Sequence, residues 1–368
     1  MKIVIAPQAF KGTISAIQAA EAMKEGVLQR FPDAEIVLAP IADGGDGTLD
    51  ILMKSFSGDY LEASVVDSLD ILKKAQWGFI RQKFLVVIES AKIFGLALLK
   101  PEQYNPLNTT TFGLGQMIHQ ILNLTPNPPD QFLIGLGDSA TQDGGMGMLQ
   151  ALGVQFLDSK GLPSAVGGNA LGKLKHIDIS YLDSRLNNAS FLIACDVNNC
   201  LLGPEGTTKT YASQKGATPE MIDILEEGME NYVRIVKRDL GIDIDIPFAG
   251  AAGGLGGAFF GFLHGQLCSG TDLILDTLQF DKLLEGADLV LTGEGCLDRQ
   301  TAYNKGPVGV ARRAKKKNIR VIAIVGKLGT GYEEALLQGI DKVIPLITEE
   351  KPAVQNTYSE IVQAIKFI

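Results

Sequence analysis

Residues 289–325 read LVLTGEGCLDRQTAYNKGPVGVARRAKKKNIRVIAIV, and this stretch decides the fold class. It begins with a mostly apolar predicted strand at 289–292, continues through a helix-forming segment near 308–317, and ends with a second predicted strand at 320–325. Two buried strands joined by a helix form a parallel pair, because the helix carries the chain back across the sheet. The alternation continues through residues 333–347 and predicts a parallel sheet flanked by helices.

The N-terminal residues have the same pattern. Residues 2–6 predict a buried strand, and Ser15 and Gln18 have the spacing of a capping box at the start of a helix that runs toward Arg30. A second strand is predicted at 35–41. Because both ends of the chain alternate strand and helix, we expect them to build one Rossmann-like domain with a parallel sheet.

The middle of the chain has a different pattern from its two ends. Residues 61–66 and 76–88 alternate apolar and polar side chains, which is typical of antiparallel strands. The chain of 368 residues also exceeds the roughly 250–300 residues at which a single core stops growing. We therefore predict a discontinuous α/β domain of residues 1–60 plus 270–368, and an inserted α/β domain of residues 61–269 with a mixed sheet.

The composition argues against several classes of protein. A net charge of −9 disfavours binding to nucleic acid or to an anionic membrane surface. The four cysteines form no CxxC pair and the three histidines are far apart, which disfavours a zinc site. No apolar run reaches the roughly 18 residues of a membrane span, and the first residues do not have the pattern of a signal peptide. We expect a soluble protein of the cytoplasm.

Three glycine-rich loops that carry acids follow predicted strands. They read DGGDG at 43–47, GDSATQDGG at 137–145 and TGEGCLD at 292–298. Glycine exposes backbone N–H groups, which bind anions, and carboxylates bind Mg²⁺ that is shared with substrate phosphates. In a parallel sheet, such loops gather where ligands bind. The loops therefore predict an enzyme with an anion and metal site.

Each loop also has a simpler structural interpretation. Residues 43–47 suit a tight turn as well as a site, whereas 137–145 favours ligand contact because two hydroxyls and two carboxylates lie among three glycines. Residues 250–257, GAAGGLGG, suit close helix packing as well as a backbone phosphate cradle. Cys195 precedes Asp196, and without a nearby histidine it is interpreted as a buried structural cysteine.

A dinucleotide-binding fingerprint competes with the phosphate and magnesium interpretation. Gly135, Gly137 and Ala140 fit G-x-G-x-x-A after a strand, and Asp158 lies about 20 residues further on, after an apolar run at 154–157. The acids within the 137–145 loop would repel a pyrophosphate unless a cation intervened. No Walker A sequence is present. An NAD-dependent dehydrogenase of a small hydroxy acid therefore remains an alternative.

Six stretches, in order along the chain, resemble the type I glycerate kinase family. They are residues 6–12 with Ser15 and Ala16, 42–48, 137–148, 196–199, 250–256, and 292–298 with Gln300, Thr301 and 305–307. The resemblance implies two α/β domains with the active site in the cleft between them. It further implies ATP and Mg²⁺ as cofactors, D-glycerate as substrate, and 2-phosphoglycerate in preference to 3-phosphoglycerate as product. The implied pathway is glyoxylate or sugar-acid catabolism.

The matching side chains define the candidate site, with roles that follow from their charge. The catalytic candidates are Lys11 and Lys305, which would neutralise anionic oxygens, and Asp196 or Asp298, which would orient and deprotonate the attacking hydroxyl. The metal candidates are Asp43, Asp196 and Glu294. The candidates for binding substrate or nucleotide are Ser139, Thr141, Asp143, Asn199, Gly253, Gly254 and Gly256.

The chain departs from the family pattern at a few positions of these loops. The family has Asp-Ser at Gln8-Ala9, glycine at Asp138, asparagine at Gln142 and proline at Cys200. The first of these departures removes a possible metal ligand and a hydroxyl donor. A non-catalytic carboxylate sensor is therefore a second alternative. The expected partners are small molecules, with no nucleic acid and no membrane, and a homodimer stays open.

Overall fold

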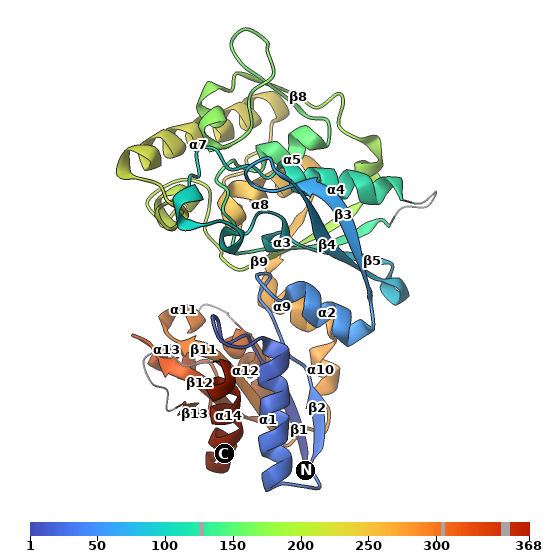
Figure 1. Ribbon diagram of the computed structural model, residues 1–368, viewed down its shortest axis with the longest axis vertical. Coiled ribbons are helices and arrows are strands. Elements are labelled where there is room, and N and C mark those ends of the chain that lie inside the picture. The colour runs from blue at the N-terminus through green and yellow to red at the C-terminus, as the bar shows by residue number, and fades with distance from the viewer. Residues whose placement is uncertain (125–128, 303–305, 347–353) are drawn as a thin grey trace. The chain divides into compact units, whose positions relative to one another are not determined.

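Two sheets organise the chain, and each belongs to a separate unit (Figure 1). The structure, a computed structural model, describes residues 1–124, 129–302, 306–346 and 354–368. The first unit consists of Met1–Asp43, Asp50–Ser55 and Gly270–Ile368, and the second of Gly44–Leu49 and Phe56–Ser269. The predicted domains differ from this division at residues 44–49 and 56–60, which group with the second unit.

The first unit is built on a five-stranded parallel sheet. In order across the sheet, its strands are β13 (Lys342–Pro345), β12 (Arg320–Leu328), β11 (Leu289–Leu297), β1 (Lys2–Pro7) and β2 (Glu35–Leu38). Ile3 of β1 pairs with Leu289 on one side and with Ile36 on the other, and all neighbouring strands run parallel. The prediction of one parallel sheet built from both ends of the chain is confirmed.

Helices cover both faces of this sheet, because successive side chains of a strand point to opposite sides. Ile3 and Ile5 join a core with α1 (Ala16–Arg30) and α14 (Val354–Ala364), which lie side by side. Val4 and Ala6 join the other core, which includes residues of α9 (Gly270–Thr277), α10 (Phe280–Leu283) and α12 (Gly306–Lys316). The shorter helices are α11 (Arg299–Ala302) and α13 (Glu333–Leu336), and α2 (Thr48–Phe56) contains residues of both units.

The second unit is built on a six-stranded mixed sheet. Its strands, in order, are β10 (Gln266–Ser269), β9 (Ser190–Cys195), β6 (Gln131–Leu136), β5 (Leu85–Glu89), β4 (Leu72–Ile80) and β3 (Asp59–Val66). The first four run parallel, and the β5–β4 and β4–β3 pairs are antiparallel. The predicted mixed sheet is confirmed, but the run at 76–88 contains two strands, because a turn at Arg81–Lys83 ends on Phe84 with φ +50°.

Aromatic side chains anchor α8 (Ala251–Leu263) to the middle of this sheet. Phe132 of β6 stacks on Phe191 of β9 at 5.0 Å, and Phe191 contacts Phe259 of α8 at 5.6 Å between ring centroids. The long helix α7 (Pro219–Leu240) begins after the capping residue Thr218 and ends at Gly241 with φ +72°. The remaining helices are α3 (Ala91–Phe94), α4 (Phe112–Asn123), α5 (Met146–Ala151) and α6 (Thr207–Tyr211).

Two short strands lie outside both sheets. They are β7 (Gln155–Leu157) and β8 (His176–Asp178), which pair only with each other as an antiparallel ribbon among the described residues. Across the described ranges, no helix combines the length and the apolar character needed to cross a membrane.

Candidate functional site

In the first unit, two acids lie near the carboxyl ends of neighbouring strands. Pro7 and Gly293 form the last residue pair between β1 and β11, so Gln8 and Glu294 follow side by side. The Gln8 backbone N–H donates to Gly293 O at 2.8 Å, and Gln8 Nε2 donates to Asp43 Oδ2 at 2.7 Å. The fold therefore brings Asp43 to the strand ends that carry Glu294, in the region where parallel sheets bind ligands.

The stretch 292–298, predicted as a loop, is strand up to Leu297, and a single threonine connects Glu294 within β11 to Asp298 just after it. Thr301 Oγ1 donates to Glu294 Oε1 at 2.7 Å, and the Thr301 N–H donates to Asp298 Oδ1 at 3.3 Å. The Asp298 N–H in turn donates to Thr301 Oγ1 at 3.2 Å. Glu294 is 9% exposed. These hydrogen bonds fix the orientation of both carboxylates, and oxygen ligands of this kind suit Mg²⁺.

A glycine lets the loop after β1 pass close to β11. A Cβ atom added to Gly295 would lie 3.2 Å from the backbone nitrogen of Lys11, so the two segments touch where Gly295 has no side chain. Lys11 itself is exposed. The contact places the predicted cation Lys11 beside the residue that follows Glu294. The other predicted catalytic lysine, Lys305, lies outside the described residues.

The DGGDG motif divides between the two units. Asp43 belongs to the first unit, whereas residues 44–49 pack on the sheet of the second. Gly44 has φ +98°, and an added Cβ would lie 2.3 Å from Ala194 O of β9, so no side chain fits there. The Leu49 N–H donates to Glu89 Oε2 at 3.0 Å at the end of β5. The motif is therefore more than a turn, because the segment packs against the ends of β9 and β5.

One departure from the family pattern has a structural explanation in this loop contact. Asp138 adopts φ +52°, a conformation that favours glycine, and its Oδ2 accepts a hydrogen bond from the Asp46 N–H at 3.3 Å. The side chain thus connects the loop after β6 to the 44–49 segment.

The carboxyl ends of the parallel strands in the second unit also carry acids. Glu89 ends β5, the 137–145 loop follows β6, and Asp196 follows β9. A Cβ atom added to Gly137 would lie 3.2 Å from Asp196 Oδ2. The sheet therefore brings Asp196 against the start of the 137–145 loop. Glu89 was not predicted as a site residue, although an acid at the end of an apolar strand is a pattern that indicates one.

Asp143 lies inside the 137–145 loop, with none of its surface exposed. Its Oδ2 accepts hydrogen bonds from Thr111 N and Oγ1 at 2.8 and 2.9 Å, from Gly147 N at 3.3 Å and from Thr110 Oγ1 at 3.4 Å, and its Oδ1 accepts one from Gly145 N at 3.1 Å. Burial raises the pKa of Asp143, although the hydrogen bonds from Thr111, Gly145 and Gly147 oppose this shift. Asp143 thus holds the loop together, and its direct contact with a ligand stays a prediction.

The glycines at the start of α8 allow two loops to pack backbone against backbone. Gly253 and Gly254 have φ values of +72° and +97°. A Cβ on Gly253 would lie 2.0 Å from Thr141 O, and one on Gly254 would lie 2.8 Å from Gly144 Cα. A Cβ on Gly256 would lie 2.5 Å from Phe248 O. These contacts support the close-packing interpretation of this stretch, and the phosphate cradle stays a prediction.

Asn199 closes the loop that begins at Asp196. Its Nδ2 donates to Glu205 O at 2.6 Å, and its Oδ1 accepts a hydrogen bond from the Tyr211 hydroxyl at 2.7 Å. Burial, together with the charge of Asp196, raises the pKa of Tyr211 to about 12. Before this loop, Cys195 is 3% exposed and burial raises the pKa of its thiol, which supports the structural interpretation of this cysteine.

A buried lysine that the sequence analysis missed contacts the same loop. Lys215 is 3% exposed, and its Nζ donates to Thr141 O at 2.7 Å, to Ser139 Oγ at 3.2 Å and to Gln142 Oε1 at 3.4 Å. Burial lowers the pKa of Lys215 to about 8, although the charges of Asp196 and Asp143 oppose this shift. No motif surrounds Lys215 in the sequence, so nothing local distinguished it from a surface lysine.

We expect Lys215 to make stability depend on pH. The pKa of its ammonium group is 10.5 in the unfolded chain and about 8 in the folded protein. Between these values the unfolded chain holds a proton that the folded protein has lost, so the free energy of unfolding rises with pH. The rise from pH 8 to pH 10.5 is about 3 kcal/mol. Urea denaturation at several pH values should show this rise in the wild type relative to Lys215→Met, and parallel pH curves would contradict it.

The structure corrects one part of the dinucleotide-binding alternative. The fingerprint requires the strand before Asp158 to join the parallel sheet, but β7 pairs with β8 in the separate ribbon. Asp158 Oδ1 accepts hydrogen bonds from Lys160 N at 2.7 Å and Leu162 N at 3.0 Å, and so closes a tight turn. Asp158 is therefore not the acid of a Rossmann ribose site.

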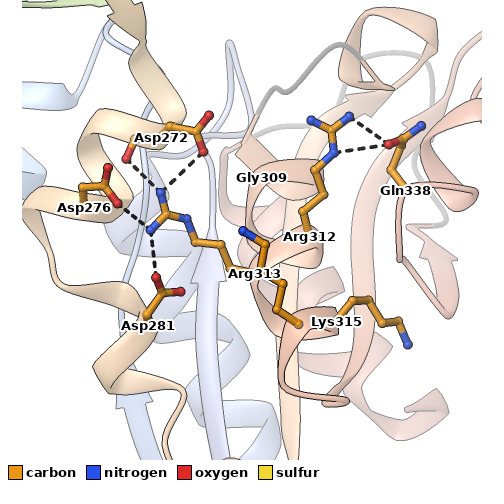
Figure 2. Close-up of a pocket in the computed structure, with 9 residues that line it drawn as sticks. Asp272, Asp276, Asp281, Gly309, Arg312, Arg313, Lys315 and Gln338 are labelled. Atoms are coloured by element: carbon orange, nitrogen blue, oxygen red, sulfur yellow. Dashed lines mark hydrogen bonds and ion pairs between the residues drawn. The ribbon is translucent and has the colours of Figure 1, made fainter.

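A pocket of about 740 Å³ in the first unit contains none of the predicted site residues. It lies along α12 and is lined by Asp272, Asp276, Asp281, Gly309, Arg312, Arg313, Lys315, Lys316 and Gln338 (Figure 2). Arg313 donates to Asp276 at 2.6 Å and Asp281 at 3.3 Å, and contacts Asp272 at 3.5 Å. Arg313 is 12% exposed, and these ion pairs tie α12 to α9 and α10. We assign a structural role to this network.

Comparisons with known proteins match the chain over nearly its whole length. The model of the glycerate kinase family matches residues 3–366. A glycerate kinase from Halalkalibacterium halodurans is 40% identical over 370 residues, which cover 100% of this chain and 97% of the relative. A glycerate 2-kinase from Escherichia coli K12 is 40% identical over 349 residues, which cover 95% and 91%.

A solved structure agrees with these sequence matches. The crystal structure of a protein from Salmonella typhimurium LT2, assigned as glycerate kinase 2, superposes with a TM-score of 0.86 at 38% identity. The match covers 100% of this chain and 97% of the solved chain. The resemblance that six short stretches predicted therefore extends along the whole chain, and the α/β fold with one parallel and one mixed sheet is confirmed.

Proposed function

The chain belongs to the glycerate kinase family, and from this premise we propose that it transfers the γ-phosphoryl group of ATP, with Mg²⁺, to the 2-hydroxyl group of D-glycerate. The observation that carries the proposal is the match over residues 3–366, which includes all six loop stretches. Kinase activity toward glycerate follows from the family. We propose three features that the family alone does not show: the nucleotide, the metal ion and the hydroxyl group that is phosphorylated.

The acidic side chains at the strand ends suit Mg²⁺. We propose Asp43 and Glu294 in the first unit and Asp196 in the second as its ligands, directly or through water. When bound, Mg²⁺ neutralises charge on the phosphate oxygens. Among the described residues, no three His, Cys, Asp or Glu side chains form a complete metal site. Mg²⁺ usually takes one or two carboxylates directly and its other ligands from phosphates and water, so at least one of the three proposed acids would act through water.

The remaining roles follow from charge and hydrogen bonding. Phosphoryl transfer needs mainly positioning and neutralisation of charge, so Lys11 and Lys305 would bind anionic oxygens. Asp196 would orient the attacking hydroxyl and accept its proton as the new O–P bond forms and the bond to ADP breaks. Asp298, whose Oδ1 accepts a hydrogen bond from the Thr301 N–H, is the alternative base.

The anion-binding roles are proposed for the second unit. The Ser139 hydroxyl, Asn199 and the backbone of the segment that contains Gly253, Gly254 and Gly256 would hold phosphate or carboxylate oxygens. Thr141 is fully buried, so we propose that it supports the loop and does not contact the ligand itself. We retain Asp143 as the residue that shapes this loop.

The proposal has two further features, the position of phosphorylation and the place in metabolism. The Escherichia coli relative is named a glycerate 2-kinase, which supports 2-phosphoglycerate over 3-phosphoglycerate as product. The proposed place in metabolism is the catabolism of glyoxylate or sugar acids, in which D-glycerate is the acid to be phosphorylated.

The test is to incubate the protein with ATP, MgCl₂ and a panel of hydroxy acids that includes D-glycerate, L-glycerate, glycolate and lactate. We expect ADP release with D-glycerate, loss of activity with EDTA, and the phosphorus NMR signal of 2-phosphoglycerate. The signal of 3-phosphoglycerate would contradict the regiochemistry. NADH binding without ADP release would favour the dehydrogenase, and ligand binding without turnover would favour the sensor.

Lys11→Ala is expected to lower kcat/KM for phosphorylation of D-glycerate by about 10- to 150-fold. The reason is the loss of one charge-assisted contact, which contributes about 1.5–3 kcal/mol. A coupled assay of ADP release measures the effect. The matched control is Lys24→Ala, because Lys24 pairs with Glu21 at 3.4 Å on the surface of α1 and should have wild-type kinetics. An unchanged kcat/KM in Lys11→Ala would remove Lys11 from the site.

A further inference from the structure

A buried ammonium group lies under the 137–145 loop of the second unit. Lys215 ends the short turn Ser213–Lys215 that follows α6, and only 3% of its surface is exposed. A buried lysine is unfavourable unless its charge and its donors are satisfied. Its Nζ has three N–H groups and donates to three oxygens, those of Thr141 O, Ser139 Oγ and Gln142 Oε1. The fold has therefore built a specific place for this cation.

The direction of the hydrogen bond between Lys215 and Ser139 has a consequence for Ser139. An ammonium group has no lone pair, so Nζ donates and Ser139 Oγ accepts at 3.2 Å. The hydroxyl hydrogen of Ser139 must then point toward a different acceptor. Among the described residues, Ser139 Oγ makes this one side-chain hydrogen bond. Ser139 is thus held as a hydrogen-bond donor.

The position of Ser139 indicates what its hydroxyl group would bind. Ser139 follows Asp138 at the carboxyl end of β6, and it is 6% exposed. The neighbouring strand end carries Asp196, whose Oδ2 lies 3.2 Å from the place of a Cβ on Gly137. A hydroxyl donor at the carboxyl end of a parallel sheet, backed by a cation, suits an anionic oxygen.

We propose that Lys215 is a positioning residue whose buried ammonium group holds Ser139 as a hydrogen-bond donor to an anionic oxygen of a substrate. The oxygen belongs to the carboxylate of the acceptor or to a phosphate of ATP. This inference rests on the proposed function, since it names how that site recognises an anion. Lys215 does not contact the substrate in this proposal, because all three of its N–H groups are used within the protein.

The test compares Ser139→Ala, Lys215→Met and the double variant Ser139→Ala/Lys215→Met with the wild type. For each protein, kcat, KM for D-glycerate and KM for ATP are measured at pH 7. We expect both single variants to raise the same KM by about tenfold, and the other KM to change by less than about twofold. A raised KM for D-glycerate identifies the acceptor carboxylate, and a raised KM for ATP identifies a phosphate.

The double variant distinguishes an effect of Lys215 through Ser139 from a purely structural role of Lys215. If Lys215 acts through Ser139, the double variant has the KM of the more affected single variant, because the second change removes nothing further. Effects that multiply, or single variants that raise different KM values, would overturn the proposal. Lys215→Arg keeps a cation at this position, and its affected KM is expected to lie closer to the wild type than that of Lys215→Met.

Two further measurements keep the outcome clear. Lys209→Met is the matched control, because Lys209 is 46% exposed and pairs with Glu226 at 3.8 Å, and wild-type kinetics are expected. If Lys215→Met fails to fold by circular dichroism, Lys215→Gln replaces it with the same expected KM pattern. If the wild type itself releases no ADP, the proposed function fails. Calorimetry with D-glycerate and with ATP then tests the inference, which fails if Ser139→Ala and Lys215→Gln do not weaken binding of the same ligand.

Discussion

Asp196→Asn is expected to lower kcat for phosphorylation of D-glycerate by about 100- to 1,000-fold, as loss of a group that acts on the transition state does. The substitution keeps the size of the side chain and removes its charge, so a metal ion loses a ligand and the attacking hydroxyl loses its base. Asp196 is half-buried after β9, where its Oδ2 lies beside Gly137 at the start of the 137–145 loop. A coupled assay of ADP release measures the rate.

The protein should remain folded in this variant, because the asparagine fits the same space. Circular dichroism should therefore give the wild-type spectrum. Asp178→Asn provides the control, since Asp178 lies on the separate ribbon and accepts a hydrogen bond from Ser180 N at 2.8 Å. We expect wild-type kinetics from it. A wild-type rate for Asp196→Asn would exclude Asp196 from the site.

Asp143→Ala is expected to lower the free energy of unfolding of the second unit by about 3–5 kcal/mol. The fully buried carboxylate accepts hydrogen bonds from three backbone N–H groups and from two threonine hydroxyls. Its removal leaves these donors buried without an acceptor, and each unsatisfied donor costs about 1–3 kcal/mol unless the loop rearranges. We therefore expect the substitution to lower the stability of the protein whether or not Asp143 contacts a ligand.

Urea denaturation followed by tryptophan fluorescence measures this effect. The chain has one tryptophan, Trp77, which is 3% exposed in β4 of the second unit, so the signal reports on that unit. Asp158→Ala is the control, because Asp158 accepts two backbone hydrogen bonds in an exposed turn. Its unfolding midpoint should stay near that of the wild type. An equally unchanged midpoint for Asp143→Ala would show that the loop does not depend on its carboxylate.

Several elements could be predicted from the sequence because their signals are local. The capping box of Ser15 and Gln18 begins α1, and Thr218 and Gly241 bound α7. The hydrogen bonds that cap a helix join residues three or four positions apart, so the spacing of residue types is sufficient. The parallel sheet could be predicted for the same reason. The spacing of apolar residues at both ends of the chain indicates which segments are strands, which are helices and which side chains are buried.

Other elements depended on partners that are far away in the sequence. The apolar run at 154–157 predicted a strand, but its place in the ribbon with β8 is set by pairing and not by the run itself. The run at 76–88 contains a break that only the turn at Phe84 reveals. Glu89 and Lys215 were missed because a charged residue is usually solvated, and its burial depends on donors and acceptors from other segments.

The sequence by itself determined the family, the α/β class, the two kinds of sheet and the order of the loops that carry the acids. Only the tertiary structure decided which side chains meet there. Lys215 lies 76 residues from Ser139, and Asp143 lies 32 residues from Thr111. The physical reason is that secondary structure follows from local periodicity, whereas a buried charge becomes stable only when packing brings distant hydrogen-bonding groups to it.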